Sequence, residues 1–254
     1  MMRDLLPPTV HVAETFGDPP GAVLLPEEEA AVARAVAKRR QEYTTVRHLA
    51  RRALACLGHG DAAVVPGQGR APRWPAGVVG ALTHCDGYRA AAVADAAAVA
   101  SVGIDAEPHE PLPEGVLDGV TLPGEREHLA ELAGKRPDVN WDRLLFSAKE
   151  SVYKTWYPLT GAWLGFKDAV LAFDHSGTFH ARVLPGALVD GGPASFDGRW
   201  NAAGGFVTTA VTVPGTGPVV PGTGAGVPGT GAGPASAPRG CRCDRGPGPL
   251  PLHG

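Results

Sequence analysis

The sequence predicts a mixed α/β (α+β) protein made of two similar halves that are joined near residue 105. Two observations support this fold class. A helical pattern precedes a first set of strand patterns, and two further helical patterns precede a second set. In addition, 44% of the 254 residues are hydrophobic, which is enough for one sizeable core or for two smaller ones. We therefore expect a folded domain over 1–213, with halves of about 1–104 and 105–213.

The first half begins with a helical segment over 26–58. Glutamates at its start and Gly58 at its end match the charge and stop signals of a helix. We expect a break near 42–45 to divide it into two helices. A loop rich in turn-forming residues follows in "PGQGRAPRWPAG", and adjacent strands follow in "VVGALTHCDGYRAAAVA" and "ASVGIDAE".

The second half contains two helical segments and then strands. Pro123 opens a short helix in "TLPGEREHLAEL". A longer amphipathic helix is predicted over 140–158, and we expect Pro158 to stop it. Strands are predicted in "DAVLAFDHSGTFHARVL" and "GRWNAAGGFVTTAVTV", and these end the folded domain.

The segment 214–254 has a different composition. Glycine and proline make up 21 of its 41 residues, it has no aromatic residue, and the unit "VPGTG", which begins at Val213, occurs three times. Such a segment cannot bury enough apolar surface to offset its ordering entropy. We expect a Gly/Pro-rich disordered tail.

The composition also bounds where the protein works. The formal net charge is −3, and no stretch reaches the ~18 apolar residues that a membrane span needs. The first residues include acids and prolines where an export signal needs an unbroken apolar run. Cys56 and Cys85 stand alone. Cys241 and Cys243 are too close together for the usual zinc or disulfide patterns. We expect a reduced, soluble, cytoplasmic protein that binds neither a membrane nor nucleic acid.

Two carboxylates stand at the end of a predicted strand in "SVGIDAEPHE". If this stretch is extended, Asp105 and Glu107 point to the same face. Two like charges repel each other there unless a cation lies between them, and Mg²⁺, with oxygen ligands and a phosphate to complete its shell, is the natural one. Alternatively, both are solvated loop acids after a strand that Pro108 ends. The pair alone does not decide between these interpretations.

The longer helix offers a second group of polar residues. Glu150 and Lys154 are four residues apart and share one helical face. Aromatic residues, among them Phe146 and Tyr153, run close to that face. A functional face, a solvated ion pair and ordinary core packing all remain compatible with this pattern.

The basic stretch "AKRRQEYTTVRHLARR" includes Arg39 and Arg47, with Glu42 as its only acid. Such a stretch can be a solubilising surface, a nucleic-acid patch or a phosphate cradle. Since the rest of the domain is not basic, a small polyanion is the better match, and arginine is preferred for phosphate. Thr83 and His84, at the end of an apolar strand, add a hydroxyl and an imidazole, although such a histidine is more often structural.

One ligand would use all of these groups: coenzyme A has a pyrophosphate for a metal, an extra phosphate and a long flexible arm. The motifs "KRRQEYTTVRHLAR", "GRAPRWPAGVVGALTHC", "SVGIDAEPH", "LLFSAKESVYKTWYPLT" and "WLGF" follow in this order over about 25–213. On these motifs the chain resembles the Sfp/EntD-type 4'-phosphopantetheinyl transferases, most of all the actinobacterial PptT branch. The pairing of G-I-D-x-E with K-E-S-x-x-K is the specific part.

The resemblance implies a 4'-phosphopantetheinyl transferase fold of two pseudo-symmetric halves with the active site at their interface. It implies transfer of 4'-phosphopantetheine from coenzyme A to a serine of acyl or peptidyl carrier proteins, with Mg²⁺ and with release of 3',5'-ADP. Such an enzyme is of the holo-[acyl-carrier-protein] synthase type. Its partners would be carriers of polyketide, nonribosomal peptide or fatty acid synthases, and we expect it to act as a monomer.

Site residues follow from the same resemblance. Asp105, Glu107 and Glu150 match the acids that hold Mg²⁺. Lys154 and Lys149 match lysines at the pyrophosphate. Among these, Glu150 is expected to take the serine proton, directly or through water, with Lys154 and Asp105 as further catalytic residues.

The remaining contacts to coenzyme A are implied in the same way. Arg39 and Arg47 match arginines on the 3'-phosphate, helped by His84, and Thr83 stands where the family often has serine. The wall along the pantetheine arm is matched by Phe146, Tyr153, Trp163 and Leu164.

The sequence departs from the family pattern at two positions. A loop lysine expected before the "PRWP" turn is absent, and Arg70 stands there as the candidate replacement. Phe146 replaces a tryptophan that is common in relatives. Two other functions fit the same residues: binding of coenzyme A without turnover, which would not need three carboxylates, and Mg²⁺-dependent phosphohydrolysis.

Overall fold

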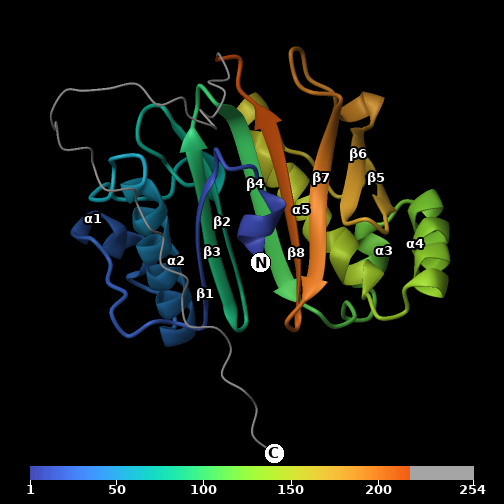
Figure 1. The fold of residues 1–254 in the computed structure, drawn as a ribbon, viewed down its shortest axis with the longest axis horizontal. Helices are drawn as coiled ribbons and strands as arrows, with labels where there is room; N and C mark the ends of the chain where they lie inside the picture. The colour runs from blue at the N-terminus through green and yellow to red at the C-terminus, as the bar shows by residue number, and fades with distance from the viewer. Residues whose placement is uncertain (218–254) are drawn as a thin grey trace, which may run out of the picture.

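The computed structural model describes residues 1–217, which confirm the mixed α+β class with two antiparallel sheets (Figure 1). The strand orders are β1-β3-β2 in the first sheet and β4-β8-β7-β6-β5 in the second. The strands are β1 (His11–Phe16), β2 (Val78–Cys85), β3 (Tyr88–Asp95), β4 (Val99–Pro108), β5 (Ala169–Asp174), β6 (Thr178–Val183), β7 (Ser195–Ala203) and β8 (Phe206–Pro214). The α-helices are α1 (Pro26–Glu29), α2 (Ala37–Ala55), α3 (Val116–Val120), α4 (Pro123–Lys135) and α5 (Trp141–Thr160).

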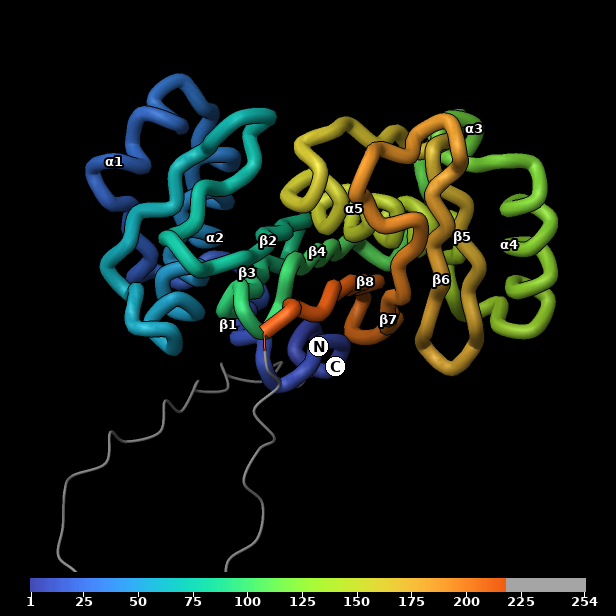
Figure 2. The backbone as a smooth tube through the Cα atoms, turned by 90° about the horizontal axis from the view of Figure 1, so that it is seen from above, coloured from blue at the N-terminus to red at the C-terminus, as the bar shows by residue number. Residues whose placement is uncertain are grey.

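The two sheets meet at their edge strands, β2 and β4, which lie side by side (Figures 1 and 2). Helix α2 packs on the first sheet, where Leu49 and Leu54 join Ala91 and Val93 in one apolar cluster. Helix α5 packs on the second sheet and supplies much of the larger core. Each sheet therefore carries one long helix, and residues that come from both meet where the sheets touch. None of the described helices is long and apolar enough to cross a membrane.

The predicted break in the first helical segment is displaced. Helix α2 is continuous through 42–45, and the interruption comes earlier, between the short 3₁₀ turn Ala30–Val32 and Ala37. The polar residues at 42–45 do not break the helix because they have partners. Thr45 donates to Asp18 at 2.7 Å, and the Glu42 carboxylate lies 3.7 Å from His84. Strand β1 was not predicted, and it completes the first sheet by pairing with β3.

Helix α5 does not stop at Pro158 but continues to Thr160. Proline removes one backbone donor, and a helix that is otherwise well packed can continue for a short turn past it. The helix ends at Gly161, which has a φ of 66° and donates its backbone N–H to Tyr157 at 2.8 Å. Left-handed glycine at this position is a common helix stop.

The chain passes from one sheet to the other at 96–98, so the expected division after residue 104 falls inside β4. The expected end of the folded part, at residue 213, falls inside β8. That strand reaches Pro214, and the N–H groups of Gly215 and Gly217 still donate to Ala98 and Ala97. Of the predicted tail, 218–254 lies outside the described residues. The division into halves and tail stays a prediction.

Helix α5 lies very close to β4 at Gly103. A Cβ atom on this buried residue would lie 2.0 Å from the backbone oxygen of Ser151 and 2.3 Å from Thr155 Oγ1. Ser101, two residues earlier, donates a hydrogen bond from its hydroxyl to the backbone oxygen of Thr155 at 2.8 Å. Because the helix backbone lies directly on the strand, the side chains of α5 are brought over the end of β4.

We predict that Gly103→Ala destabilises the protein by about 3 kcal/mol, because the added methyl group must push a helix backbone off the strand. Urea denaturation would measure the loss. Gly124→Ala in α4 is the matched control: no heavy atom lies within 4 Å of its Cβ position, so its stability should stay within about 1 kcal/mol of wild type. Equal stability of both variants would contradict the close approach.

Candidate active site

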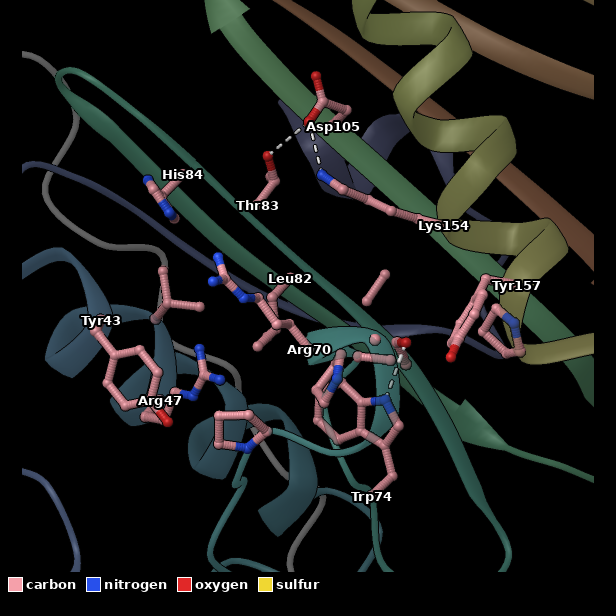
Figure 3. Close-up of a pocket in the computed structure, with 18 of the residues that line it drawn as sticks. Tyr43, Arg47, Arg70, Trp74, Leu82, Thr83, His84, Asp105, Lys154 and Tyr157 are labelled. Atoms are coloured by element: carbon pink, nitrogen blue, oxygen red, sulfur yellow. Dashed lines mark hydrogen bonds and ion pairs between the residues drawn. The ribbon is translucent and has the colours of Figure 1, made fainter. Parts of the chain in front are cut away.

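A cavity of about 860 Å³ lies at the junction of the two sheets (Figure 3). Its walls come from α2, the loop before β2, strands β2 and β4, and α5. Among the predicted residues, those on its walls are Arg39, Arg47, Arg70, Thr83, His84, Asp105, Glu150, Tyr153 and Lys154. Residues from both halves of the sequence thus share one recess.

Asp105 is the centre of the polar network in this cavity. Its Oδ1 accepts a hydrogen bond from Thr83 Oγ1 at 3.1 Å (Figure 3). The same oxygen forms an ion pair with Lys154 Nζ at 2.7 Å. The same Thr83 oxygen accepts the backbone N–H of Ala106 at 3.1 Å, and Lys154 also donates to the Ile104 oxygen. Asp105 Oδ2 is buried and has no hydrogen-bond partner among the described residues.

The other two predicted carboxylates differ in their surroundings. Glu107 follows Asp105 along the regular strand β4, as predicted, and it accepts a hydrogen bond from Arg143 of α5 at 3.3 Å. Burial, together with the nearby Asp105, raises the pKa of Glu107 to about 7. Burial also raises the pKa of Glu150, whose carboxylate has no hydrogen-bond partner within 1–217.

The three acids do not form a ready-made metal cluster: none of the described residues make up a group of three or more histidine, cysteine, aspartate or glutamate side chains that could hold a metal. Glu107 is held by Arg143, a residue that the sequence did not single out. Arg143 also donates to the backbone oxygens of Glu110 and Pro111, which fastens the segment after β4 to α5.

The charges at Lys154 favour its protonated form. Burial alone would lower its pKa, but the carboxylates of Asp105 and Glu150 outweigh burial and raise it. Lys154 is therefore a cation held against a buried acid at the junction of the sheets.

The opposite end of the cavity is basic. Arg39 is half exposed and its Nη1 contacts His84 Nε2, while Arg47 is buried and its Nε donates to the Val64 oxygen at 3.0 Å. The Arg47 guanidinium also lies 3.7 Å from the ring centre of Tyr43. Burial and the neighbouring Arg39 lower the pKa of His84 to about 4, so its ring is neutral at pH 7 and can accept a hydrogen bond.

Three aromatic residues that the sequence did not assign to the site also line this cavity: Tyr43, Trp74 and Tyr157. Trp74 belongs to the "PRWP" turn and donates its ring N–H to the Gly80 oxygen at 3.0 Å. Tyr157 lies three residues after Lys154, so helical spacing could have identified it. Arg70 is in the same loop as Trp74 and has a φ of 65°.

Lys149 does not line this cavity, because its ammonium group is bound elsewhere in the protein. Its buried Nζ donates to Glu125 and to the backbone oxygens of Val120 and Phe166, each at 2.7 Å. Burial lowers the pKa of Lys149. Glu125 in turn accepts the backbone N–H of Leu171 at 2.8 Å. All three ammonium donors are used within the protein, so this lysine joins α5 to its neighbours.

The residues expected along the pantetheine arm border a second cavity of about 200 Å³, which shares Glu150 and Tyr153 with the first. Trp163 and Leu164 line it, and the Trp163 ring lies 4.9 Å from that of Tyr153. Phe146 is not among the lining residues of either cavity, but its ring stacks at 5.3 Å on that of Phe166, which does line the second one.

A recess with two acids at one end and arginines at the other, at the junction of two helix-covered sheets, is typical of an enzyme site for a phosphate-rich ligand. Comparison with known families gives the particular class. Residues 27–94 match the 4'-phosphopantetheinyl transferase N-terminal domain, and residues 101–198 match the 4'-phosphopantetheinyl transferase superfamily. The chain belongs to the 4'-phosphopantetheinyl transferase superfamily.

Individual relatives agree. The chain is 57% identical to the 4'-phosphopantetheinyl transferase Svp of Streptomyces mobaraensis, over 84% of this chain and 89% of the relative. It is 50% identical to Npt of Nocardia iowensis, over 83% and 99% of the two chains. It is 48% identical to PptT of Mycobacterium tuberculosis, over 84% and 98%.

The predicted family, fold and enzyme class are thereby confirmed, and the protein is a transferase. With this family come coenzyme A as the substrate and carrier proteins, in general, as the partners. Neither alternative, binding of coenzyme A without turnover or phosphohydrolysis, is supported.

The network around Lys149 leads to a prediction about stability. Lys149→Met should destabilise the protein by about 3–5 kcal/mol, because it leaves the Glu125 carboxylate buried without its cation. The double variant Lys149→Met with Glu125→Leu should recover part of this loss. Urea denaturation of the three proteins measures both effects.

An exposed ion pair provides the control for Lys149. Arg136→Met breaks the surface pair of Arg136 with Asp138 and should leave the denaturation midpoint nearly unchanged. If Lys149→Met behaves like this control, the ammonium group is not a structural tether.

Proposed function

We propose that this protein transfers 4'-phosphopantetheine from coenzyme A to a serine of acyl or peptidyl carrier proteins in an Mg²⁺-dependent reaction that releases 3',5'-ADP. The partners in this proposal are carriers of polyketide, nonribosomal peptide or fatty acid synthases, and the enzyme acts as a monomer in the cytoplasm. The observation that best supports this chemistry is that basic and acidic side chains line the same cavity. One cavity connects the arginines of α2 with the acids and Lys154 at the junction of the sheets.

The reaction forms a bond between the serine Oγ of the carrier and the β-phosphorus of coenzyme A. The bond from that phosphorus to the bridging oxygen breaks, and 3',5'-ADP leaves with that oxygen. Glu150 is the proposed acceptor of the serine proton: it lines the cavity, it has no hydrogen-bond partner in the described residues, and burial raises its pKa. A carboxylate with a raised pKa is a better base than an ordinary one.

Lys154 has the proposed role of offsetting negative charge on the pyrophosphate. It already lies at the cavity wall, and its pKa is raised by Asp105 and Glu150, so it stays protonated. Such fixed charge is effective in phosphoryl-type transfer, because positioning and charge neutralisation supply most of the catalysis. Lys149 has no part in this proposal, since its ammonium donors are already used.

Two of the three acids offer oxygens that fit a bound Mg²⁺. Asp105 Oδ2 is buried without a partner, and the Glu150 carboxylate is also unpaired within the described part of the chain. Unpaired carboxylate oxygens are the ligands that hard divalent cations take. Glu107 is the proposed third ligand and would have to share its carboxylate with Arg143. When bound, Mg²⁺ would neutralise charge on the pyrophosphate.

The remaining parts of coenzyme A are assigned by charge and polarity. Arg39, Arg47 and the neutral ring of His84 are proposed to bind the 3'-phosphate, with Arg70 and Thr83 also in reach of the cavity. The pantetheine arm is proposed to run over Tyr153 towards the second cavity, along Trp163, Leu164 and the Phe146–Phe166 stack.

We predict that Asp105→Ala and Glu150→Gln each lower transfer at saturating Mg²⁺ on the order of a hundredfold or more. The readout is the mass shift of an apo carrier protein, with thermal melting to check the fold. Activity within a few-fold of wild type in either variant would contradict the roles of these acids.

Wild-type protein should also melt at a higher temperature with Mg²⁺ and coenzyme A together than with either alone.

The arginines give a separate prediction about the 3'-phosphate. Replacing Arg39 and Arg47 by alanine, singly and together, should weaken binding of coenzyme A on the order of tenfold or more per contact. Binding of dephospho-coenzyme A, which lacks only that phosphate, should change little. Isothermal titration measures both ligands. Arg52→Ala, an exposed α2 residue away from the cavity walls, is the control and should change neither. Equal losses for the two ligands in the Arg39 and Arg47 variants would exclude the assignment.

A further inference from the structure

Glu28 is a fully buried acid that does not line either cavity at the site. Its Oε2 accepts the backbone N–H of Leu25 at 3.0 Å, at the start of α1, and the Nη1 of Arg51 at 2.6 Å. Its Oε1 accepts the backbone N–H of Val64 at 2.9 Å. The ion pair with Arg51 explains why a carboxylate is tolerated inside the protein. It does not explain why Glu28 also accepts the Val64 N–H.

That third bond leads towards the active site. Val64 is fully buried, and while its N–H is held by Glu28, its carbonyl oxygen accepts the Nε of Arg47 at 3.0 Å. The backbone of one residue is thus held from both sides. Val64 also precedes the loop that contributes Pro66, Gly69 and Arg70 to the cavity.

The hydrogen bond from Arg47 Nε fixes which edge of its guanidinium faces the cavity. The group is also held by a contact with the Tyr43 ring, whose centre lies 3.7 Å from its central carbon. Since Nε is used by the Val64 oxygen, a ligand would have to bind through the Nη atoms. A planar fork binds phosphate well only when it is correctly oriented, so its orientation decides how strongly it binds.

We propose that Glu28 is a positioning residue for the recognition of the 3'-phosphate: through the Val64 backbone it holds Arg47 in its binding orientation. Arg51 lies one helical turn after Arg47 on α2, so Glu28 is tied to the helix directly through Arg51 and indirectly through Val64. The inference rests on the proposed role of Arg47. A purely structural Glu28 would hold α1 and α2 together and would have no effect on the choice of ligand.

The experiment measures binding of coenzyme A and of dephospho-coenzyme A to the full chain by isothermal titration, together with thermal melts. The variants are Glu28→Gln, Arg47→Ala and the double variant. Glu28→Gln keeps the size of the side chain but replaces one acceptor oxygen by a donor, so it cannot satisfy all three partners. We expect it to weaken coenzyme A on the order of tenfold and dephospho-coenzyme A by less than about twofold. The double variant should bind no more weakly than Arg47→Ala.

Two further variants separate positioning from stability. Arg51→Met removes the charged partner of Glu28 but leaves the bonds from Leu25 and Val64. It should therefore lower the melting temperature without changing the preference between the two ligands. If Glu28→Gln does not fold, Glu28→Asp keeps the charge for Arg51 but shortens the reach to Val64. It should show the same selective loss of coenzyme A binding.

The outcomes distinguish this inference from the proposed function. If Arg47→Ala weakens both ligands equally, Arg47 does not bind the 3'-phosphate, and both the assignment and the inference fail. If Arg47→Ala is selective but the Glu28 variants are not, the positioning role is overturned while the proposed function stands. The positioning role is also overturned if the double variant loses a binding free energy for coenzyme A equal to the sum of the two single losses.

Discussion

The site depends on one interaction, the hold on the buried carboxylate of Asp105. A buried acid is strongly unfavourable unless it is paired and hydrogen-bonded. Here Thr83 supplies the hydrogen bond from β2, and Lys154 supplies the cation from α5. These partners come from the two halves of the sequence, so both reach the acid only when the sheets meet at β2 and β4. The close contact of α5 with β4 at Gly103 then fixes the height at which Lys154 and Glu150 lie over the strand.

Within 1–217, only one of the two carboxylate oxygens of Asp105 is bonded. Both donors use Oδ1 of Asp105, while Oδ2 stays buried and unpaired among the described residues. Native proteins leave few buried polar atoms unsatisfied, and the exceptions concentrate where function requires them. The raised pKa values of Glu107 and Glu150 have the same origin, since burial and a shared negative field disfavour their ionised forms. The acids are therefore arranged at a cost in stability that a bound cation would relieve, which is the physical reason for proposing Mg²⁺ at this end of the cavity.

Much of this could be predicted from local patterns. Alternation along a strand put Asp105 and Glu107 on one face, and helical spacing put Glu150 and Lys154 together, because both periods are properties of the backbone. Features that depend on distant partners could not be read in the same way. Strand β1 exists because it pairs with β3, and α2 stays continuous at 42–45 because Thr45 finds Asp18. Arg143 carries no local signal for its contact with Glu107.

Lys149 shows why a motif match does not assign a role to each of its members. Neighbouring residues on a helix point about 100° apart, so the K-E-S-x-x-K motif spreads over more than one face of α5. Glu150 and Lys154 lie on the face that meets the cavity. Lys149 borders only the second cavity, and Glu125 and two backbone oxygens take all of its donors. A buried ammonium with three short bonds cannot reach a pyrophosphate without breaking them, and the unpaired Glu125 left behind would itself be costly. The same motif therefore provides both the face of the helix that lines the cavity and the lysine that ties the helix to its neighbours.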